Sequence, residues 1–120
     1  MSDMKYINSA AYLSDIESIV SARSYITNHF IAAEECGELT QAISKMVRYI
    51  DGRVDDGDMK KDDAGMYMKL ADHILEEAAD VLICIYTLMK VYGFNSDDLD
   101  DQVKWRMRRN LERIGKEVEE

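Results

Sequence analysis

Apolar side chains recur at spacings of three and four residues along most of this chain, which is the pattern of amphipathic α-helices. The pattern predicts four helices, over about residues 9–22, 24–49, 66–91 and 97–118. Gly93 is placed to end the third helix, and Ser96 is placed to cap the fourth. The buried side of the second helix is predicted to hold Ile26, Phe30, Ala33, Gly37, Ile43, Met46, Val47 and Ile50. We therefore expect an all-α fold, a four- to five-helix bundle.

The third predicted helix is apolar on nearly every side after Asp80. Residues 81–89 carry no charge, and a helix that is apolar all round must be surrounded by other elements. Three partner helices would cover most of this surface, and a second copy of the chain is the economical cover for the rest. We therefore expect a homo-oligomer that associates through its apolar helices.

A polar segment over residues 51–65 separates the second and third helices and holds three of the six glycines. Its aspartates invite comparison with an EF-hand calcium loop, which needs acids at positions 1, 3 and 5 before a glycine at position 6. With Gly57 at position 6, Gly52 and Val54 would stand at positions 1 and 3. The segment is therefore interpreted as a solvated loop inserted into a single domain over residues 1–120.

The composition narrows the class of protein. Apolar residues make up 47% of the chain and proline is absent, which excludes a disordered chain and disfavours a turn-rich β-sandwich. Fifteen basic and twenty-four acidic residues give a net charge of −9, a poor match for nucleic-acid phosphates. Two cysteines are too few for a disulfide framework, and we find neither a signal core nor a membrane span. We expect a cytoplasmic protein without nucleic-acid or membrane partners.

One acidic pattern occurs twice, as EECGE over residues 34–38 and as EEAAD over residues 76–80. Each is Glu-Glu-x-x-acid inside a predicted helix, and at about 100° per residue the three acids fall within an arc of about 100°. The acids that share a face are Glu34, Glu35 and Glu38 on the second helix, and Glu76, Glu77 and Asp80 on the third.

A solvated helix face is the ordinary explanation for charged residues, and two observations count against it here. The positions four residues from these acids are mostly apolar or acidic, with His73 as the one possible cation. Like-charged pairs four residues apart, such as Glu34 with Glu38, destabilise a helix. Acids that repel one another on an apolar face require a cation.

The donor atoms indicate which cation this is. All the candidate ligands are carboxylate oxygens, which suit Mg²⁺, Mn²⁺ or Ca²⁺. A di-iron bundle needs Glu-x-x-His on two helices, and this chain, whose histidines are His29 and His73, has no such motif. Since Mg²⁺ in proteins usually works together with substrate phosphates, the pattern indicates phosphate chemistry.

The fourth predicted helix is the basic part of an acidic chain. Residues 104–116 hold six of the fifteen basic residues and one acid. The residues along one side of this helix are Arg106, Arg109, Asn110 and Arg113. The arginine guanidinium groups and the asparagine amide suit hydrogen bonds to phosphate and sugar oxygens. The alternative to phosphate binding is that these basic residues interact favourably with the dipole of their own helix at its C-terminal end. Weaker candidates, for stacking on a base, are His29, Phe30 and Trp105.

Three stretches together resemble the MazG-like all-α nucleoside triphosphate pyrophosphohydrolases, a superfamily that includes all-α dCTP and dUTP pyrophosphatases and phosphoribosyl-ATP pyrophosphohydrolases. They are EECGEL at 34–39, EEAADVL at 76–82 and RMRRNLER at 106–113. The resemblance covers about residues 24–115. Thirty-eight residues separate Glu38 from Glu77, which is longer than the usual family spacing, and Arg106 stands where lysine is common.

The resemblance implies a reaction and a set of roles. The family hydrolyses a nucleoside triphosphate between the α- and β-phosphates, which gives the monophosphate and pyrophosphate, and it associates as dimers or tetramers. Carried over to this chain, the resemblance implies that the Mg²⁺ ligands are Glu35, Glu38, Glu77 and Asp80. The same residues could bind Mn²⁺ in place of Mg²⁺. Glu34, with Glu76 second, is implied to orient or deprotonate the attacking water, and Arg106 or Arg109, Asn110 and Arg113 to bind phosphate or sugar.

Two rival interpretations stay open. One keeps the family and changes the substrate to phosphoribosyl-ATP or to a damaged nucleotide. The other is a non-catalytic helical module for metal binding or protein interaction, which would release no pyrophosphate from any nucleotide. A nucleic-acid binder is disfavoured by the net charge.

Overall fold

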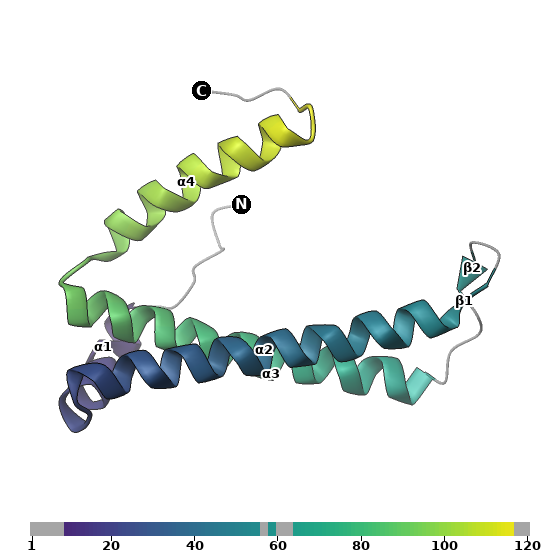
Figure 1. The fold of residues 1–120 in the computed structure, drawn as a ribbon. Coiled ribbons are helices and arrows are strands. Elements are labelled where there is room, and N and C mark those ends of the chain that lie inside the picture. Colours follow the sequence, from purple (N-terminus) through teal and green to yellow (C-terminus); the bar gives the residue numbers. More distant parts are fainter. Residues whose placement is uncertain (1–8, 56–57, 60–63, 117–120) are drawn as a thin grey trace.

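The computed structural model describes residues 9–55, 58–59 and 64–116 of the chain. Within these residues it contains four helices and one two-stranded antiparallel sheet (Figure 1). The elements are α1 (Ser9–Ala22), α2 (Tyr25–Arg53), β1 (Val54–Asp55), β2 (Asp58–Met59), α3 (Ala64–Tyr92) and α4 (Ser96–Arg113). The all-α fold class is confirmed, and the sheet is a small addition to it.

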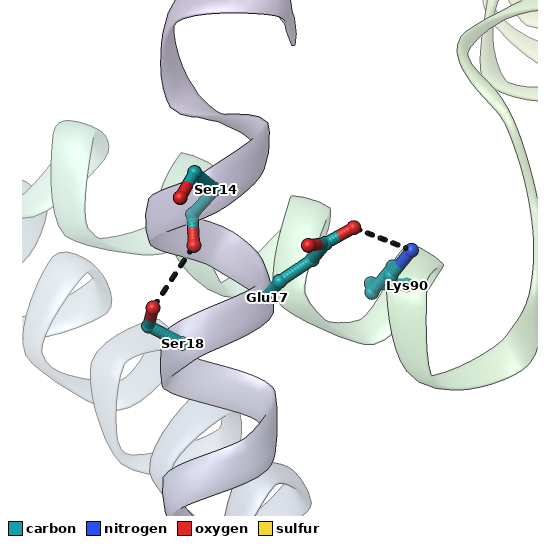
Figure 2. Close-up of polar contacts among 4 residues, drawn as sticks. All are labelled: Ser14, Glu17, Ser18 and Lys90. Atoms are coloured by element: carbon teal, nitrogen blue, oxygen red, sulfur yellow. Dashed lines mark hydrogen bonds and ion pairs between the residues drawn. The ribbon is translucent and has the colours of Figure 1, made fainter.

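Two long antiparallel helices form the body of the molecule. α2 and α3 lie side by side along most of their length, and α1 packs against α3 near the end where α4 begins (Figure 1). An ion pair of 3.2 Å between Glu17 Oε1 and Lys90 Nζ joins α1 to α3 (Figure 2). Because both side chains are about half exposed, this pair contributes at most about 1 kcal/mol and mainly orients α1.

The face that α2 buries differs from the predicted one. The side chains buried among the described residues are Ile16, Asn28, Ala32, Ala42, Met46, Cys84 and Thr87. Met46 was predicted correctly, but Phe30 is 63% exposed and Val47 is 57% exposed. α2 meets α3 through small residues such as Ala32 and Ala42, which allow the two backbones to approach closely. Large apolar side chains that were predicted on the buried face, those of Ile26, Phe30, Ile43 and Val47, are therefore left exposed.

The segment over residues 51–65 is only partly a loop. α2 continues to Arg53, and β1 then pairs with β2 through Val54 opposite Met59 and Asp55 opposite Asp58. α3 begins at Ala64, while residues 56–57 and 60–63 lie outside the described part of the chain. The helices thus extend further into this segment than predicted, because neither Gly52 nor Gly65 interrupts them.

Gly93 ends α3 as predicted. Its φ is +76°, and the amide of Phe94 donates to the carbonyl of Met89 at 2.9 Å, which is the Schellman arrangement. The predicted cap of α4 at Ser96 is wrong by one residue. Asn95 is the N-cap, since its side chain accepts from the Asp98 amide while the Asp98 carboxylate accepts from the Asn95 amide.

α4 departs from the rest of the molecule. It leaves the end of α3 and runs away from the α2–α3 pair (Figure 1), and none of its residues is buried. It ends at Arg113 rather than near residue 118, because Gly115 adopts a φ of +75° and Lys116 donates to the carbonyl of Leu111. Among the described residues, the helices lack the length and apolar character that a membrane crossing would require.

Candidate metal centre

The antiparallel pairing of α2 and α3 brings the two acidic motifs together. Glu35 comes from α2, and Glu77 and Asp80 come from α3, one turn apart. Each offers one carboxylate oxygen, and these oxygens all lie within 4.8 Å of one another. We call Glu35, Glu77 and Asp80 the acid cluster. Three of the four predicted metal ligands are therefore neighbours in space.

Two oxygens of the acid cluster are enclosed without a hydrogen-bond donor. Glu35 and Glu77 are half-buried and Asp80 is exposed. The Oε2 atoms of Glu35 and Glu77 are both shielded from solvent and have no hydrogen-bond partner. Leaving a carboxylate oxygen in this state is costly. A hard divalent cation held between these carboxylates would offset this cost, so the donor set fits Mg²⁺ or Mn²⁺.

The pKa of Glu35 also bears on cation binding at the acid cluster. Its pKa is raised above the ordinary value of 4.5, first because burial removes water from the carboxylate and then because Glu38 and Asp80 carry like charge beside it. A hydrogen bond with the Glu38 side chain and the charge of Glu77 raise it further. Glu38 thus contacts the acid cluster at its exposed edge and remains a candidate fourth ligand. A bound cation would reverse these effects, because it favours the ionised form.

His73 supports the acid cluster from α3. Its Nε2 atom lies 3.3 Å from Oε1 of Glu77, four residues further along the helix. This contact holds Oε1 of Glu77, while Oε2 has no hydrogen-bond partner. Metal-binding carboxylates are commonly oriented by such a neighbour. The i,i+4 spacing of His73 and Glu77 was the signal in the sequence for this positioning role.

Glu34 and Glu76 flank the acid cluster in sequence. Both side chains are exposed, and neither belongs to the group of three carboxylates that the described residues bring within 4.8 Å. Their exposure leaves both accessible to water.

The basic candidates lie apart from the acid cluster within the chain. Arg106, Arg109, Asn110 and Arg113 are all exposed on α4, and α4 runs away from the two helices that supply the acids (Figure 1). The guanidinium carbons of Arg106 and Arg109 lie 4.8 and 5.0 Å from the ring centroid of Trp105. The tryptophan is therefore a partner of two arginines in this structure.

His29, one of the two aromatic candidates near the start of α2, forms a hydrogen-bonded group with Tyr25 and Tyr92. His29 Nδ1 lies 2.8 Å from the Tyr25 carbonyl, which can only accept, so Nδ1 carries the proton. His29 Nε2 then accepts from the Tyr92 hydroxyl at 2.6 Å. The pKa of Tyr92 is raised, first by its hydrogen bond with Tyr25 and then by burial. Because His29 is half-buried and its ring centroid lies 4.7 Å from that of Tyr25, the exposed Phe30 is the more accessible candidate for stacking.

Comparisons with family models, with curated proteins and with solved structures find no match to this chain. The acid cluster and the motifs that form it are therefore the features of this chain that indicate a function.

Proposed function

We propose that this protein is a Mg²⁺-dependent hydrolase that converts a nucleoside triphosphate and water into a nucleoside monophosphate and pyrophosphate. The observation that carries the proposal is the acid cluster with its two enclosed, unpartnered oxygens. The resemblance of the motifs to MazG-like pyrophosphohydrolases supplies the reaction. The expected setting is the nucleotide pool of a cytoplasm.

The proposal gives each acid a role. Glu35, Glu77 and Asp80 would hold Mg²⁺, with Glu38 as a further ligand and Mn²⁺ as a possible substitute. The bound ion would supply positive charge against the phosphate oxygens. Glu34, or Glu76 in its place, would orient the attacking water and accept its proton on a carboxylate oxygen.

The remaining candidates would bind the substrate. Arg106 or Arg109, with Asn110 and Arg113, would hold phosphate or sugar oxygens through bidentate and amide contacts, and Phe30 would stack on the base. This role requires α4 to approach the acid cluster of its own chain or that of a second copy. A homodimer or homotetramer is expected, and apolar side chains such as Leu75, which is 70% exposed on α3, support an association through α2 and α3.

A non-catalytic metal-binding module is the second candidate function. The separation of α4 from α2 and α3 favours it, because the basic residues and the acid cluster then serve no common substrate. The two candidates differ in one measurable property, which is turnover.

Pyrophosphate release distinguishes the two candidates. The purified protein is incubated with Mg²⁺ and a panel of canonical and modified nucleoside triphosphates, with phosphoribosyl-ATP included. We expect release from at least one substrate and a loss of at least about 1,000-fold in Asp80→Asn. Asp15→Asn, an exposed acid on α1, is the matched control and should retain full activity. A protein that binds Mg²⁺ but releases nothing from any substrate would support the non-catalytic module.

A further inference from the structure

Two lysines lie at the same level of the α2–α3 pair, beyond the acid cluster in the direction of the β1–β2 sheet. Because α2 and α3 run antiparallel (Figure 1), each step forward along α2 matches a step back along α3. Glu35 faces the two members of the acid cluster on α3. Ten residues further along α2, Lys45 is therefore level with residues 67–70 of α3, and Lys69 stands within this range. We call Lys45 and Lys69 the lysine pair.

The lysine pair lies on the side of α2 and α3 to which the acid cluster opens. Lys45 follows Glu38 by seven residues, and Lys69 precedes Asp80 by eleven. These spacings are close to two and three whole turns, so each lysine is aligned with its acid to within about 20° around the helix. Glu38 and Asp80 are exposed, and both lie close enough to Glu35 to raise its pKa. The two acids thus mark one side of the helix pair, and the two lysines share it.

Neither member of the lysine pair is engaged by the described part of the chain. Lys90 and Lys104 each form an ion pair of 3.2 Å with an acid. Lys45 and Lys69 are exposed and form no ion pair or hydrogen bond with another described residue. In a chain with a net charge of −9, two such lysines on one face are available to an anion.

The charge of the acid cluster creates a need for further cations on this face. Its three ionised carboxylates with one bound Mg²⁺ would keep a net charge of −1, and Glu38 adds another negative charge beside them. A polyphosphate that approached the metal would therefore be repelled by the surrounding acids. The arginines of α4 do not offset this charge within the chain, because α4 runs away from α2 and α3 (Figure 1). The lysine pair supplies positive charge on the same face.

We propose that the lysine pair binds the two terminal phosphates of the substrate, the part that leaves as pyrophosphate. The assignment rests on the proposed hydrolase function, which places the metal at the acid cluster. Lysine is a usual phosphate ligand, a point charge on a flexible stem. The rise from Glu38 to Lys45 is about 10.5 Å. Since helix side chains lean toward the N-terminus, Lys45 leans back toward the acid cluster and Lys69 leans away from it. Lys45 therefore binds the nearer phosphate and Lys69 the terminal one.

Binding of inorganic pyrophosphate to the full chain tests the lysine pair without turnover. Calorimetric titration in the presence of Mg²⁺ should show saturable binding by the wild type. Lys45→Gln and Lys69→Gln should each raise the dissociation constant about tenfold, because each removes one charged contact to phosphate. The double variant should raise it about 100-fold. Lys45→Arg keeps the charge and should stay within about threefold of the wild type.

Matched controls separate this effect from a general change in charge. Lys104→Gln removes the same charge from α4, where the lysine pairs with Asp100, and should bind pyrophosphate as the wild type does. Circular dichroism should show equal helix content in all variants. Their affinity for Mn²⁺ should be equal to within about twofold, because the lysines lie more than a Debye length from the acid cluster along the helices.

Three outcomes would overturn the proposal: a wild type that binds no pyrophosphate, lysine variants that bind it as tightly as the wild type, or an equal loss in Lys104→Gln. Release of pyrophosphate from nucleotides, measured in parallel, reports separately on the hydrolase. Lysine-dependent binding of pyrophosphate without turnover of any nucleotide would support the lysine pair as a polyphosphate site and contradict the hydrolase alone.

Discussion

At the scale of single residues, Glu35 couples the stability of the fold to its proposed function. Its raised pKa means that the folded protein holds this proton more tightly than the unfolded chain, for which the ordinary value is 4.5. In the absence of metal, the contribution of Glu35 to stability therefore falls as pH rises from about 4.5 through its folded pKa. The charge that binds a cation is thus a charge that opposes folding without one.

Replacing Glu35 with glutamine should separate these two effects. Without metal at pH 7, Glu35→Gln should melt about 3 °C higher than the wild type, because the destabilising charge is gone. It should also lose the stabilisation that Mg²⁺ or Mn²⁺ gives to the wild type. Melting curves with and without metal, between pH 4.5 and 7.5, measure both quantities. Glu34→Gln, at the exposed neighbouring position, should show neither change in melting temperature.

His73 provides a second test at this scale. His73→Ala leaves Oε1 of Glu77 without its neighbour at 3.3 Å, and metal affinity should fall about 10-fold, as it does when groups that orient metal ligands are removed. His73→Gln can still donate to Glu77 and should retain most of the affinity. Calorimetric titration with Mn²⁺ measures both variants. Equal affinity in His73→Ala and the wild type would show that His73 does not position Glu77.

At the scale of elements, the periodicity of the sequence predicted the helices better than their faces. The four helices and the Gly93 terminus are confirmed, because spacing and glycine conformation are local properties. The buried face of α2 is not local. Ala32 and Ala42 are buried rather than Phe30, since close approach to α3 selects small residues, and an apolar pattern does not tell which apolar side is covered.

One glycine at a helix end and one inside a helix offer a matched pair of substitutions. Gly93→Ala should destabilise the protein by about 1 kcal/mol, since a φ of +76° is strained for alanine. Gly37→Ala, inside α2, should stabilise it by about 0.5–1 kcal/mol. An added methyl group meets no atom within 4 Å at either site, so the opposite signs would arise from the backbone. Urea denaturation measures both, and a loss of stability in both would contradict the helix boundaries described for α2.

At the scale of the whole molecule, the acid cluster was predictable and the position of α4 was not. Two acidic motifs, each on one helix face, meet where their helices pair with those faces together and in matching register, and the structure brings carboxylate oxygens of three of the four predicted ligands within 4.8 Å of one another. No comparable pairing of helices fixes the position of the basic motif on α4. The α3–α4 junction at Gly93 to Asn95 sets the direction of α4, and the hydrophobic periodicity does not predict that direction.

The central claim is that the acid cluster holds a divalent cation, and a titration with Mn²⁺ tests it most directly. Electron paramagnetic resonance of free Mn²⁺ counts the ions that the purified protein removes from solution. We predict saturable binding by the wild type, competition by Mg²⁺, and a loss of affinity of about 100-fold in Glu77→Gln. Glu112→Gln, an exposed acid on α4, should bind as the wild type does. Equal binding by Glu77→Gln and the wild type would contradict the assignment of the site.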